Sequence, residues 1–281
     1  MQNQAKFLDE PGIKYALAVE RQPSGERKIA MDAKSSELYR PQEAEAADEN
    51  EQKKISEMRR VLEEEDASTM GVDDLTLRRF LRARDMDVVK GKVMFLKYLK
   101  WKREFLPRGY VSPSEIRNEL AQNKIFLQGF DRQRRPIGVL FGAKHFQNKI
   151  DEFKGLVVYI LDKLTERLPS GQEKFVLIID LKGWGYANSD LRANIESLNI
   201  VQNYYPERLH KAFVVHVPYV FMTVWRLTCP FIDKNTRKKI VFVENKKLKS
   251  TLLQDIDESQ LPELYGGKLK LIPIDGTVVN G

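Results

Sequence analysis

The sequence predicts an α/β protein in which a small N-terminal helical module precedes a mainly parallel sheet covered by helices. One observation is a series of short apolar runs rich in β-branched residues, at 175–179, 212–217 and 240–243. Another is that helical stretches separate these runs, an alternation typical of parallel sheets. A third is an amphipathic helical periodicity that precedes residue 113 and stops there.

Three helices are expected before residue 113. Residues 43–65 consist mostly of strong helix formers and carry one narrow apolar stripe. The second helix can be capped by Asp73 or Asp74, because a carboxylate at that position accepts from the first free amides. The third helix spans about 87–105, and its apolar positions follow at three- and four-residue steps. These positions are Val89, Val93, Leu96 and Leu99.

The larger part of the chain is expected to be α/β. Residues 125–127 and 136–141 flank a charged turn and predict a β-hairpin. Further helices are expected at about 153–167, 190–204, 219–232 and 250–255. The chain is thereby divided into a mostly disordered tail, a helical module and a larger α/β domain, at 1–42, 43–110 and 111–275.

Composition excludes several classes of protein. The 281 residues include 42% hydrophobic and 31% charged side chains, which is the balance of a globular protein. The longest uncharged apolar run, residues 212–225, is too short to span a bilayer. An integral membrane protein is therefore not expected. The single cysteine, Cys229, fits a reducing compartment, and we expect a cytoplasmic protein.

Charge is distributed unevenly along the chain. The formal net charge is +7, but residues 1–50 hold seven basic and ten acidic side chains, so the rest of the chain carries +10. Basic residues concentrate in Arg78–Arg108 and in Lys234–Lys249. Such a surface indicates a nucleic acid, an anionic membrane or a phosphorylated small molecule. An ordinary solvated surface is the alternative for each run.

The segment around 219–232 is apolar on nearly every side. A helix without a polar face is either buried in the core or faces a second apolar environment such as a lipid. The sequence alone leaves both interpretations open.

Motifs of common enzymes are absent from the sequence. It contains no phosphate-binding loop of the Walker type and no Gly-x-Ser-x-Gly turn. The three histidines, His145, His210 and His216, lie far apart without a partner at metal-ligand spacing. We therefore expect no catalytic residues, no metal and no cofactor, and we expect a binding protein instead of an enzyme.

Five motifs occur in a fixed order along the chain: Leu77–Arg84, Asp180–Gly183, Gln202–Arg208, Pro230–Asp233 with Thr236 and Lys239, and Leu261–Gly267. Together they resemble the CRAL-TRIO family of lipid-binding proteins. Within that family they are most similar to the Sec-fourteen type of phosphatidylinositol/phosphatidylcholine transfer protein. The resemblance covers about residues 55–272 and leaves residues 1–50 unexplained.

This resemblance implies a lipid pocket that is floored by the sheet and closed by a gate helix at about 219–232. The apolar residues of the gate are Tyr219, Phe221, Met222, Trp225 and Phe231. It also implies a phosphatidylinositol headgroup site, with Glu207 on the inositol hydroxyls and Arg84, Thr236 and Lys239 on the phosphate. The family places a second basic residue after Arg84, where this chain has Asp85.

The phosphatidylcholine site of the family is altered in this chain. Members that bind phosphatidylcholine carry two hydroxyl residues on the strand before the Asp-Leu-Lys-Gly motif. The matching positions here are Phe175 and Leu177, which cannot hydrogen-bond a phosphate. We therefore predict that phosphatidylinositol recognition is kept, and that phosphatidylcholine is bound poorly or is replaced by another hydrophobic ligand.

Two functions from different classes fit these observations. The first is non-enzymatic binding and transfer of phosphatidylinositol between membranes, or its presentation to lipid kinases. The second is a lipid-sensing scaffold that binds one hydrophobic ligand and regulates a partner without bulk transfer. In both cases the basic surface is expected to dock reversibly on an anionic membrane. Nucleic acid is not expected as a partner, because the basic runs lack interleaved exposed aromatic residues.

Overall fold

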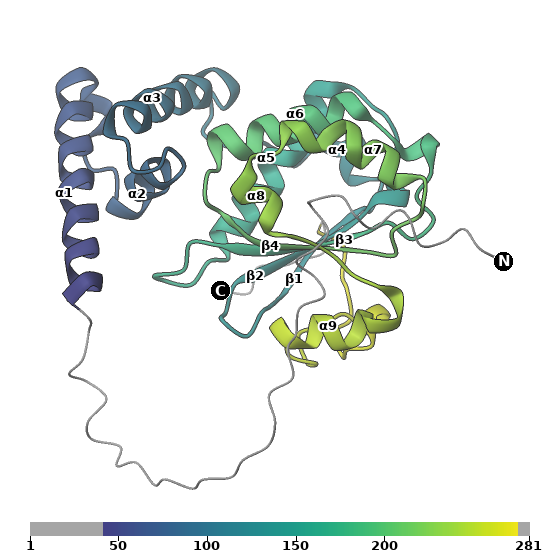
Figure 1. Ribbon diagram of the computed structural model, residues 1–281. Coiled ribbons are helices and arrows are strands. Elements are labelled where there is room, and N and C mark those ends of the chain that lie inside the picture. The colour runs from purple at the N-terminus through teal and green to yellow at the C-terminus, as the bar shows by residue number, and fades with distance from the viewer. Residues whose placement is uncertain (1–41, 275–281) are drawn as a thin grey trace, which may run out of the picture. The chain divides into compact units, whose positions relative to one another are not determined.

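The computed structural model describes residues 42–274, and Figure 1 shows their arrangement. The described residues from 46 to 274 belong to one compact unit. The side-chain contacts of the fold and of the site all lie within residues 46–274. The tail expected at 1–42 lies outside the described residues, apart from Gln42.

Three helices form the N-terminal module: α1 (Gln42–Glu65), α2 (Asp74–Arg82) and α3 (Val88–Phe105). Asp73, and not Asp74, caps α2 by accepting from the Thr76 amide at 2.8 Å. The three helices bury a shared apolar core, as the narrow stripe on α1 predicts. Its buried members are Ile55, Met58, Leu62, Leu77, Phe80, Leu81, Met94 and Phe95.

The stripe predicted for α3 is wrong in its first two positions. Val89 and Val93 are 70% and 60% exposed. The buried face of the helix runs instead through Gly91, Met94 and Phe95. Gly91 explains the rotation, because a Cβ at that position would lie only 3.2 Å from the Leu81 side chain. The missing side chain thus lets α2 and α3 approach closely on a face that a count of apolar residues overlooks.

A five-stranded sheet forms the centre of the larger part, with strand order β1-β2-β3-β4-β5. The strands β1 (Ile125–Phe130) and β2 (Pro136–Phe141) form the expected antiparallel hairpin. All later pairings are parallel. The remaining strands are β3 (Phe175–Asp180), β4 (Leu209–Val215) and β5 (Ile240–Phe242). The predicted fold class, α/β with a mainly parallel sheet, is therefore confirmed.

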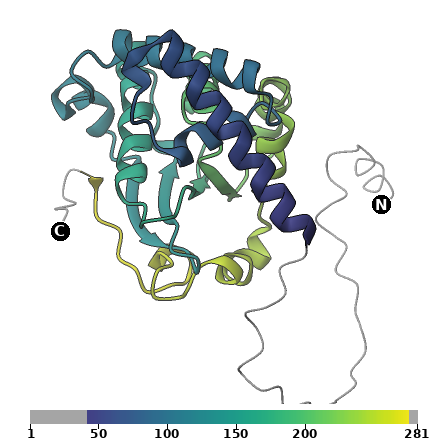
Figure 2. The same ribbon diagram turned by 90° about the vertical axis from the view of Figure 1, so that its left-hand side faces the viewer.

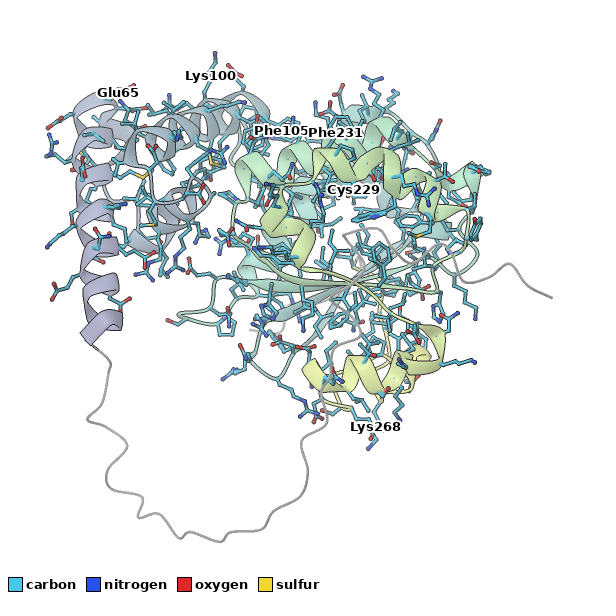
Figure 3. All side chains as sticks on the ribbon, in the orientation of Figure 1. Glu65, Lys100, Phe105, Cys229, Phe231 and Lys268 are labelled. Carbon is cyan, nitrogen blue, oxygen red and sulfur yellow. The ribbon has the colours of Figure 1, made fainter. Side chains whose placement is uncertain are left out.

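Helices cover the two faces of the sheet unequally, as Figures 1 and 2 show. On one face lie α4 (Arg117–Leu120), α5 (Ile150–Glu166), α6 (Leu191–Tyr204), α7 (Phe221–Thr228) and α8 (Lys234–Lys238). The other face packs against α9 (Leu248–Asp255). The helix expected at 219–232 is shorter than predicted: α7 is followed by a tight turn at Cys229–Phe231, and both of these residues are labelled in Figure 3.

The helical module contacts the rest of the unit through α3 and α2. Trp101 of α3 stacks on Tyr204 of α6, with ring centroids 4.0 Å apart and planes 7° apart. Arg79 of α2 forms an ion pair with Glu173, just before β3, at 3.1 Å. These contacts place α2 beside the N-terminal ends of the parallel strands.

Candidate functional site

Glu207 and Lys239 lie together at the N-terminal edge of the sheet. Glu207 comes shortly before β4, and Lys239 immediately precedes β5. Because these strands are parallel neighbours, residues that precede them meet at the same edge. The Lys239 Nζ lies 3.1 Å from Glu207 Oε2, and the two side chains are 20% and 21% exposed. The structure thus brings these two predicted site residues into direct contact.

Thr236 is held next to this pair by the short helix α8. Asp233 caps the helix by accepting from the Thr236 amide at 2.8 Å. The Lys239 amide in turn donates to the Thr236 carbonyl at 3.0 Å. The predicted threonine and lysine are therefore fixed relative to each other by one helical turn.

Arg84 is not joined to this group. Its guanidinium donates to the carbonyl of the neighbouring Ala83 at 2.8 Å. Within residues 48–274, no hydrogen bond or ion pair links it to Glu207, Thr236 or Lys239. Asp85, which takes the place of the family's second basic residue, is exposed and has a φ of 52°.

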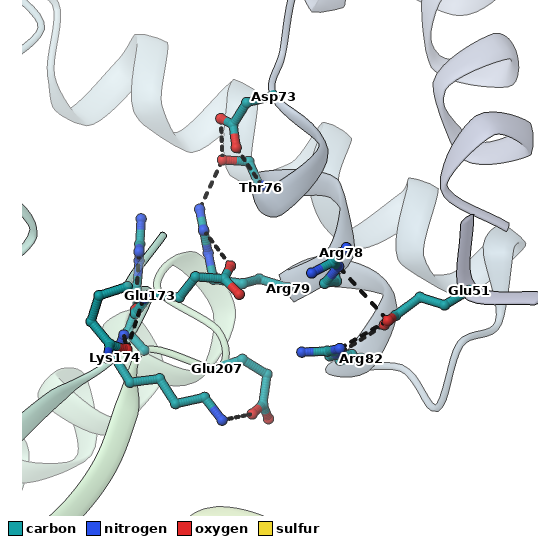
Figure 4. Close-up of polar contacts among 11 residues, drawn as sticks. Glu51, Asp73, Thr76, Arg78, Arg79, Arg82, Glu173, Lys174 and Glu207 are labelled. Carbon is teal, nitrogen blue, oxygen red and sulfur yellow. Dashed lines mark hydrogen bonds and ion pairs between the residues drawn. The ribbon is translucent and has the colours of Figure 1, made fainter. Parts of the chain in front are cut away.

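Sequence reasoning missed two arginines of α2 that face the site, Arg79 and Arg82. In Figure 4 Arg79 contacts Glu173, Lys174 contacts Glu207, and Arg82 contacts Glu51 of α1. Lys174 Nζ lies 4.0 Å from the same Glu207 oxygen that Lys239 contacts. The signal in the sequence was the three-residue spacing of the arginines, which puts them on one face of a helix.

Arg208 adds another cation, which lies close to Arg79. Its guanidinium donates to the Glu173 carbonyl at 3.0 Å. Burial, followed by the charge of Arg79, lowers the pKa of Arg208 to about 10. Positive charge therefore gathers around two carboxylates, with Arg79 and Arg208 at Glu173 and Lys174 and Lys239 at Glu207. Such a surface suits a ligand with both hydroxyl and phosphate groups.

The face of the sheet toward α7 is apolar but incompletely covered. On β3, Leu177 and Ile179 are only half-buried, although the strand is central in the sheet. Leu140, the partner of Ile179 on β2, is also partly accessible, whereas Val214, its partner on β4, is buried in a cluster with Val224 of α7. Phe242 in the same row is exposed on the edge strand β5. Interior positions with this exposure indicate accessible apolar space between the sheet and the helices above it.

The α7 segment has one packed side and one exposed side. Val224 and Thr228 are buried, whereas Tyr219 is 96% exposed and Phe231 is 54% exposed. Trp225 meets the Phe242 ring edge-on at 5.0 Å, and Phe221 meets Trp184 at 5.4 Å. The segment is therefore not a fully buried core helix.

Side chains from two neighbouring helices hold the C-terminal end of this segment. Gln202 of α6 donates to the Phe231 carbonyl at 3.0 Å and accepts from the Asp233 amide at 2.7 Å. Arg237 of α8 donates to the carbonyls of Cys229 and Ile232. These contacts connect the segment to α8, and so to the pair of Glu207 and Lys239.

No group of His, Cys, Asp and Glu residues that could hold a metal ion occurs within residues 48–274. In the same part of the chain, none of the helices combines the length and the apolar character that crossing a bilayer requires.

Comparison with known proteins identifies similar sequences over most of the chain. A family model for the CRAL/TRIO domain matches residues 120–267. The SEC14 cytosolic factor of Kluyveromyces lactis is 29% identical over 252 residues, which is 82% of each chain. That of Candida glabrata is 31% identical over 216 residues, 70% of this chain and 71% of the other.

Two further matches concern a plant protein and a solved structure. "Phosphatidylinositol/phosphatidylcholine transfer protein SFH14" of Arabidopsis thaliana is 29% identical, over 79% of this chain and 42% of that protein. A crystal structure of Sfh5 matches with a TM-score of 0.60 and 18% identity, and covers 80% of this chain and 93% of that one. The structural match supports the fold.

Proposed function

Because the chain belongs to the CRAL/TRIO domain family, as its Sec14-like relatives also indicate, we propose that it binds phosphatidylinositol and transfers it between membranes. One observation carries this proposal: the Glu207–Lys239 pair lies at the N-terminal end of the parallel strands, and farther along β3 the apolar residues Leu177 and Ile179 are partly accessible on the face that α5 to α7 cover. The pair supplies polar contacts for a headgroup, and the apolar face supplies space for acyl chains.

The headgroup would be bound by complementary groups of the site. Glu207 accepts hydrogen bonds from inositol hydroxyls, while Lys239 and the Thr236 hydroxyl donate to the phosphodiester. Arg84 joins them when its guanidinium leaves the Ala83 carbonyl. Hydrogen bonds to charged groups contribute about 1.5–3 kcal/mol each, so the headgroup and not the acyl chains determines selectivity.

The acyl chains need only as favourable an environment as the bilayer gives them. Burying a methylene gains about 0.8 kcal/mol, but the lipid already has this gain in the membrane. The apolar floor and the α7 segment therefore only have to bury the acyl chains as well as the bilayer does. They must also let the lipid enter and leave without exposing these chains to water. The packed and exposed sides of α7 fit such a gate.

Phosphatidylcholine is proposed to be a poor ligand of this chain. Phe175 is fully buried in the core near α5, and Leu177 is an apolar part of the accessible floor. Neither residue can donate a hydrogen bond to a phosphate. The Arabidopsis relative is named for both lipids.

The same proposal includes the setting in which the protein works. It is a cytoplasmic, non-enzymatic protein that docks reversibly on anionic membranes and presents its lipid to kinases there. The boundaries 43–110 for the helical module and 111–275 for the lipid-binding domain belong to this proposal. A lipid-sensing scaffold remains the alternative function, and it differs in that it need not release its ligand between vesicles.

Lys239→Ala tests the proposed headgroup site. Transfer of phosphatidylinositol between vesicles should fall at least tenfold, because a charge-assisted contact to the phosphate is lost. Thermal stability should change little, since the pair with Glu207 is partly exposed. Lys238→Ala, an exposed neighbour on α8, is the matched control and should transfer normally. Undiminished transfer by Lys239→Ala would remove this residue from the site, and absence of transfer by the wild-type protein would favour the scaffold.

A further inference from the structure

Glu51 of α1 forms a two-point ion pair with Arg82 of α2. Arg82 Nε lies 2.7 Å from Glu51 Oε1, and Arg82 Nη2 lies 2.9 Å from Oε2. Arg78 is a more distant partner, with its Nε 3.8 Å from Glu51 Oε2. The Glu51 side chain is only 15% exposed. Its carboxylate therefore occupies the side of the Arg82 guanidinium that would otherwise bind an anion in a fork-like manner.

This ion pair lies beside the headgroup site. In Figure 4, Arg82 extends toward Glu207, while Glu51 approaches it from the opposite side. The hydrogen bond from Arg82 to Glu51 is the main cause of the raised pKa of Arg82, and the charges of Glu173 and Glu207 raise it further. Arg82 thus interacts electrostatically with the carboxylate that we assign to the inositol hydroxyls.

A simple structural role does not account for this contact. The α1–α2 packing already has an apolar core that includes Ile55 and Met58. It also has a second ion pair, between Arg59 and Asp74, at 2.6 Å. Glu51 lies more than one turn before Ile55, where the buried apolar stripe of α1 begins within residues 48–65. Its position matters chiefly for the arginines of α2.

If they were free, Arg82 and Arg78 would favour an inositol lipid that carries a phosphate on its ring. Guanidinium groups bind phosphate in two-point contacts, and a phosphomonoester carries more charge than a carboxylate. With Glu51 in place, such a phosphate would meet Glu51 and Glu207 on either side of Arg82. Because α1 holds the Glu51 carboxylate at Arg82, Glu51 competes with a ring phosphate for this guanidinium at a high effective concentration.

We propose that Glu51 determines lipid specificity, because it occupies Arg82 and Arg78 and so excludes phosphatidylinositol that carries a further phosphate on the ring. The inference rests on the proposed function, since it places the inositol ring at Glu207. It assigns to the helical module a part in ligand choice: the module supplies both the cations that could bind a ring phosphate and the anion that prevents this.

Glu51→Gln tests the inference, because the amide keeps the shape of the side chain and removes its charge. Labelled phosphatidylinositol is transferred from phosphatidylcholine vesicles, with unlabelled phosphatidylinositol or phosphatidylinositol monophosphate as competitor. The wild-type protein should prefer phosphatidylinositol. The variant should shift the ratio of the two inhibitory concentrations toward the monophosphate by about tenfold, which is the effect of one charge-assisted contact. Transfer of phosphatidylinositol itself should persist.

Two further variants assign the effect to Arg82. Glu57→Gln, at an exposed position of the same helix, removes the same charge and should leave the ratio unchanged. Glu51→Gln combined with Arg82→Gln should return the ratio to its wild-type value. An unchanged ratio in folded Glu51→Gln, or an equal shift in Glu57→Gln, would overturn the inference while leaving the proposed function intact.

Soluble headgroups keep the test independent of lipid transfer. Glycerophosphoinositol and its ring-phosphorylated form can be titrated against the wild-type protein and Glu51→Gln by calorimetry. The same shift in preference is expected. If the wild-type protein transferred no phosphatidylinositol but the soluble headgroups showed this shift, the proposed transfer would be wrong and the role of Glu51 would stand. If the wild-type protein and Glu51→Gln showed the same ratio of affinities for the two headgroups, that role would be contradicted.

Discussion

The two faces of strand β3 differ in what covers them, although their sequences are alike. Val176 and Ile178 point toward α9 and are completely buried. Leu177 and Ile179 lie on the opposite face, where Leu177 packs near α5 and α6 and Ile179 packs near α7, and both remain partly accessible. All four are aliphatic residues of one central strand. The comparison teaches that the helices opposite a strand, and not its own residues, decide whether a face is sealed core or a floor for a ligand.

The largest expected loss of stability comes from shortening a side chain on the face of β3 that is buried against α9. Ile178→Ala should lower the free energy of unfolding by about 3 kcal/mol, because it leaves a cavity in close-packed surroundings. Leu177→Ala, one residue away, should cost less than about 1 kcal/mol, since its surroundings are already open. Denaturant unfolding of the lipid-free protein measures both. Equal losses would show that the two faces are packed alike.

A partly buried histidine, His145, should make stability depend on pH. Burial, then the charge of Lys124, lowers the pKa of His145 from 6.5 to about 4. The unfolded chain therefore takes up this proton near pH 6.5, whereas the folded protein takes it up only near pH 4. The stability that results is fully present above pH 6.5 and is lost as the pH falls toward 4.

His145→Gln should flatten this part of the pH profile. The amide does not titrate, so the free energy of unfolding should fall less steeply between pH 6.5 and 4 than in the wild-type protein. Urea unfolding at several pH values gives the comparison. Parallel profiles for the two proteins would show that the surroundings of His145 do not lower its pKa.

The smallest change in stability is expected on the partly accessible face of β3, where a substitution should instead change which lipid is bound. Leu177→Thr restores a hydroxyl at a position where phosphatidylcholine-binding relatives are expected to carry one. Transfer of phosphatidylcholine should rise relative to phosphatidylinositol, and the free energy of unfolding should change by less than about 1 kcal/mol. Leu253→Thr, on α9 at the opposite face of the sheet, is the control. No gain in phosphatidylcholine transfer would indicate that the position does not line the ligand site.

The sequence was sufficient to predict the sheet and its helices, because continuous apolar strands that alternate with helices are compatible with few folds besides a parallel sheet. It was not sufficient to orient α3 correctly, since the close approach at Gly91 outweighs the apolar character of Val89 and Val93. It could not predict which face of β3 is fully buried either, because both faces carry aliphatic residues. That difference depends on α7, whose apolar sequence is equally compatible with a core helix.

For the site, the resemblance supplied Glu207, Thr236 and Lys239, and the structure added the contact that joins the first and the last. Arg79, Arg82 and Glu51 remained unrecognised for a physical reason. The three-residue spacing of Arg79 and Arg82 places both on one face of a helix, but it does not indicate what that face contacts. The partner of Arg82 comes from another helix, 31 residues earlier in the chain. Such pairings are set by tertiary packing and leave no local pattern.

Mass spectrometry of the lipid that co-purifies with the protein tests the central claim most directly. The account predicts phosphatidylinositol in the wild-type protein, little phosphatidylcholine, and loss of the inositol lipid from Lys239→Ala while that variant stays folded. Phosphatidylcholine as the main lipid, or phosphatidylinositol retained equally by both proteins, would contradict the assignment of the headgroup to the pair of Glu207 and Lys239.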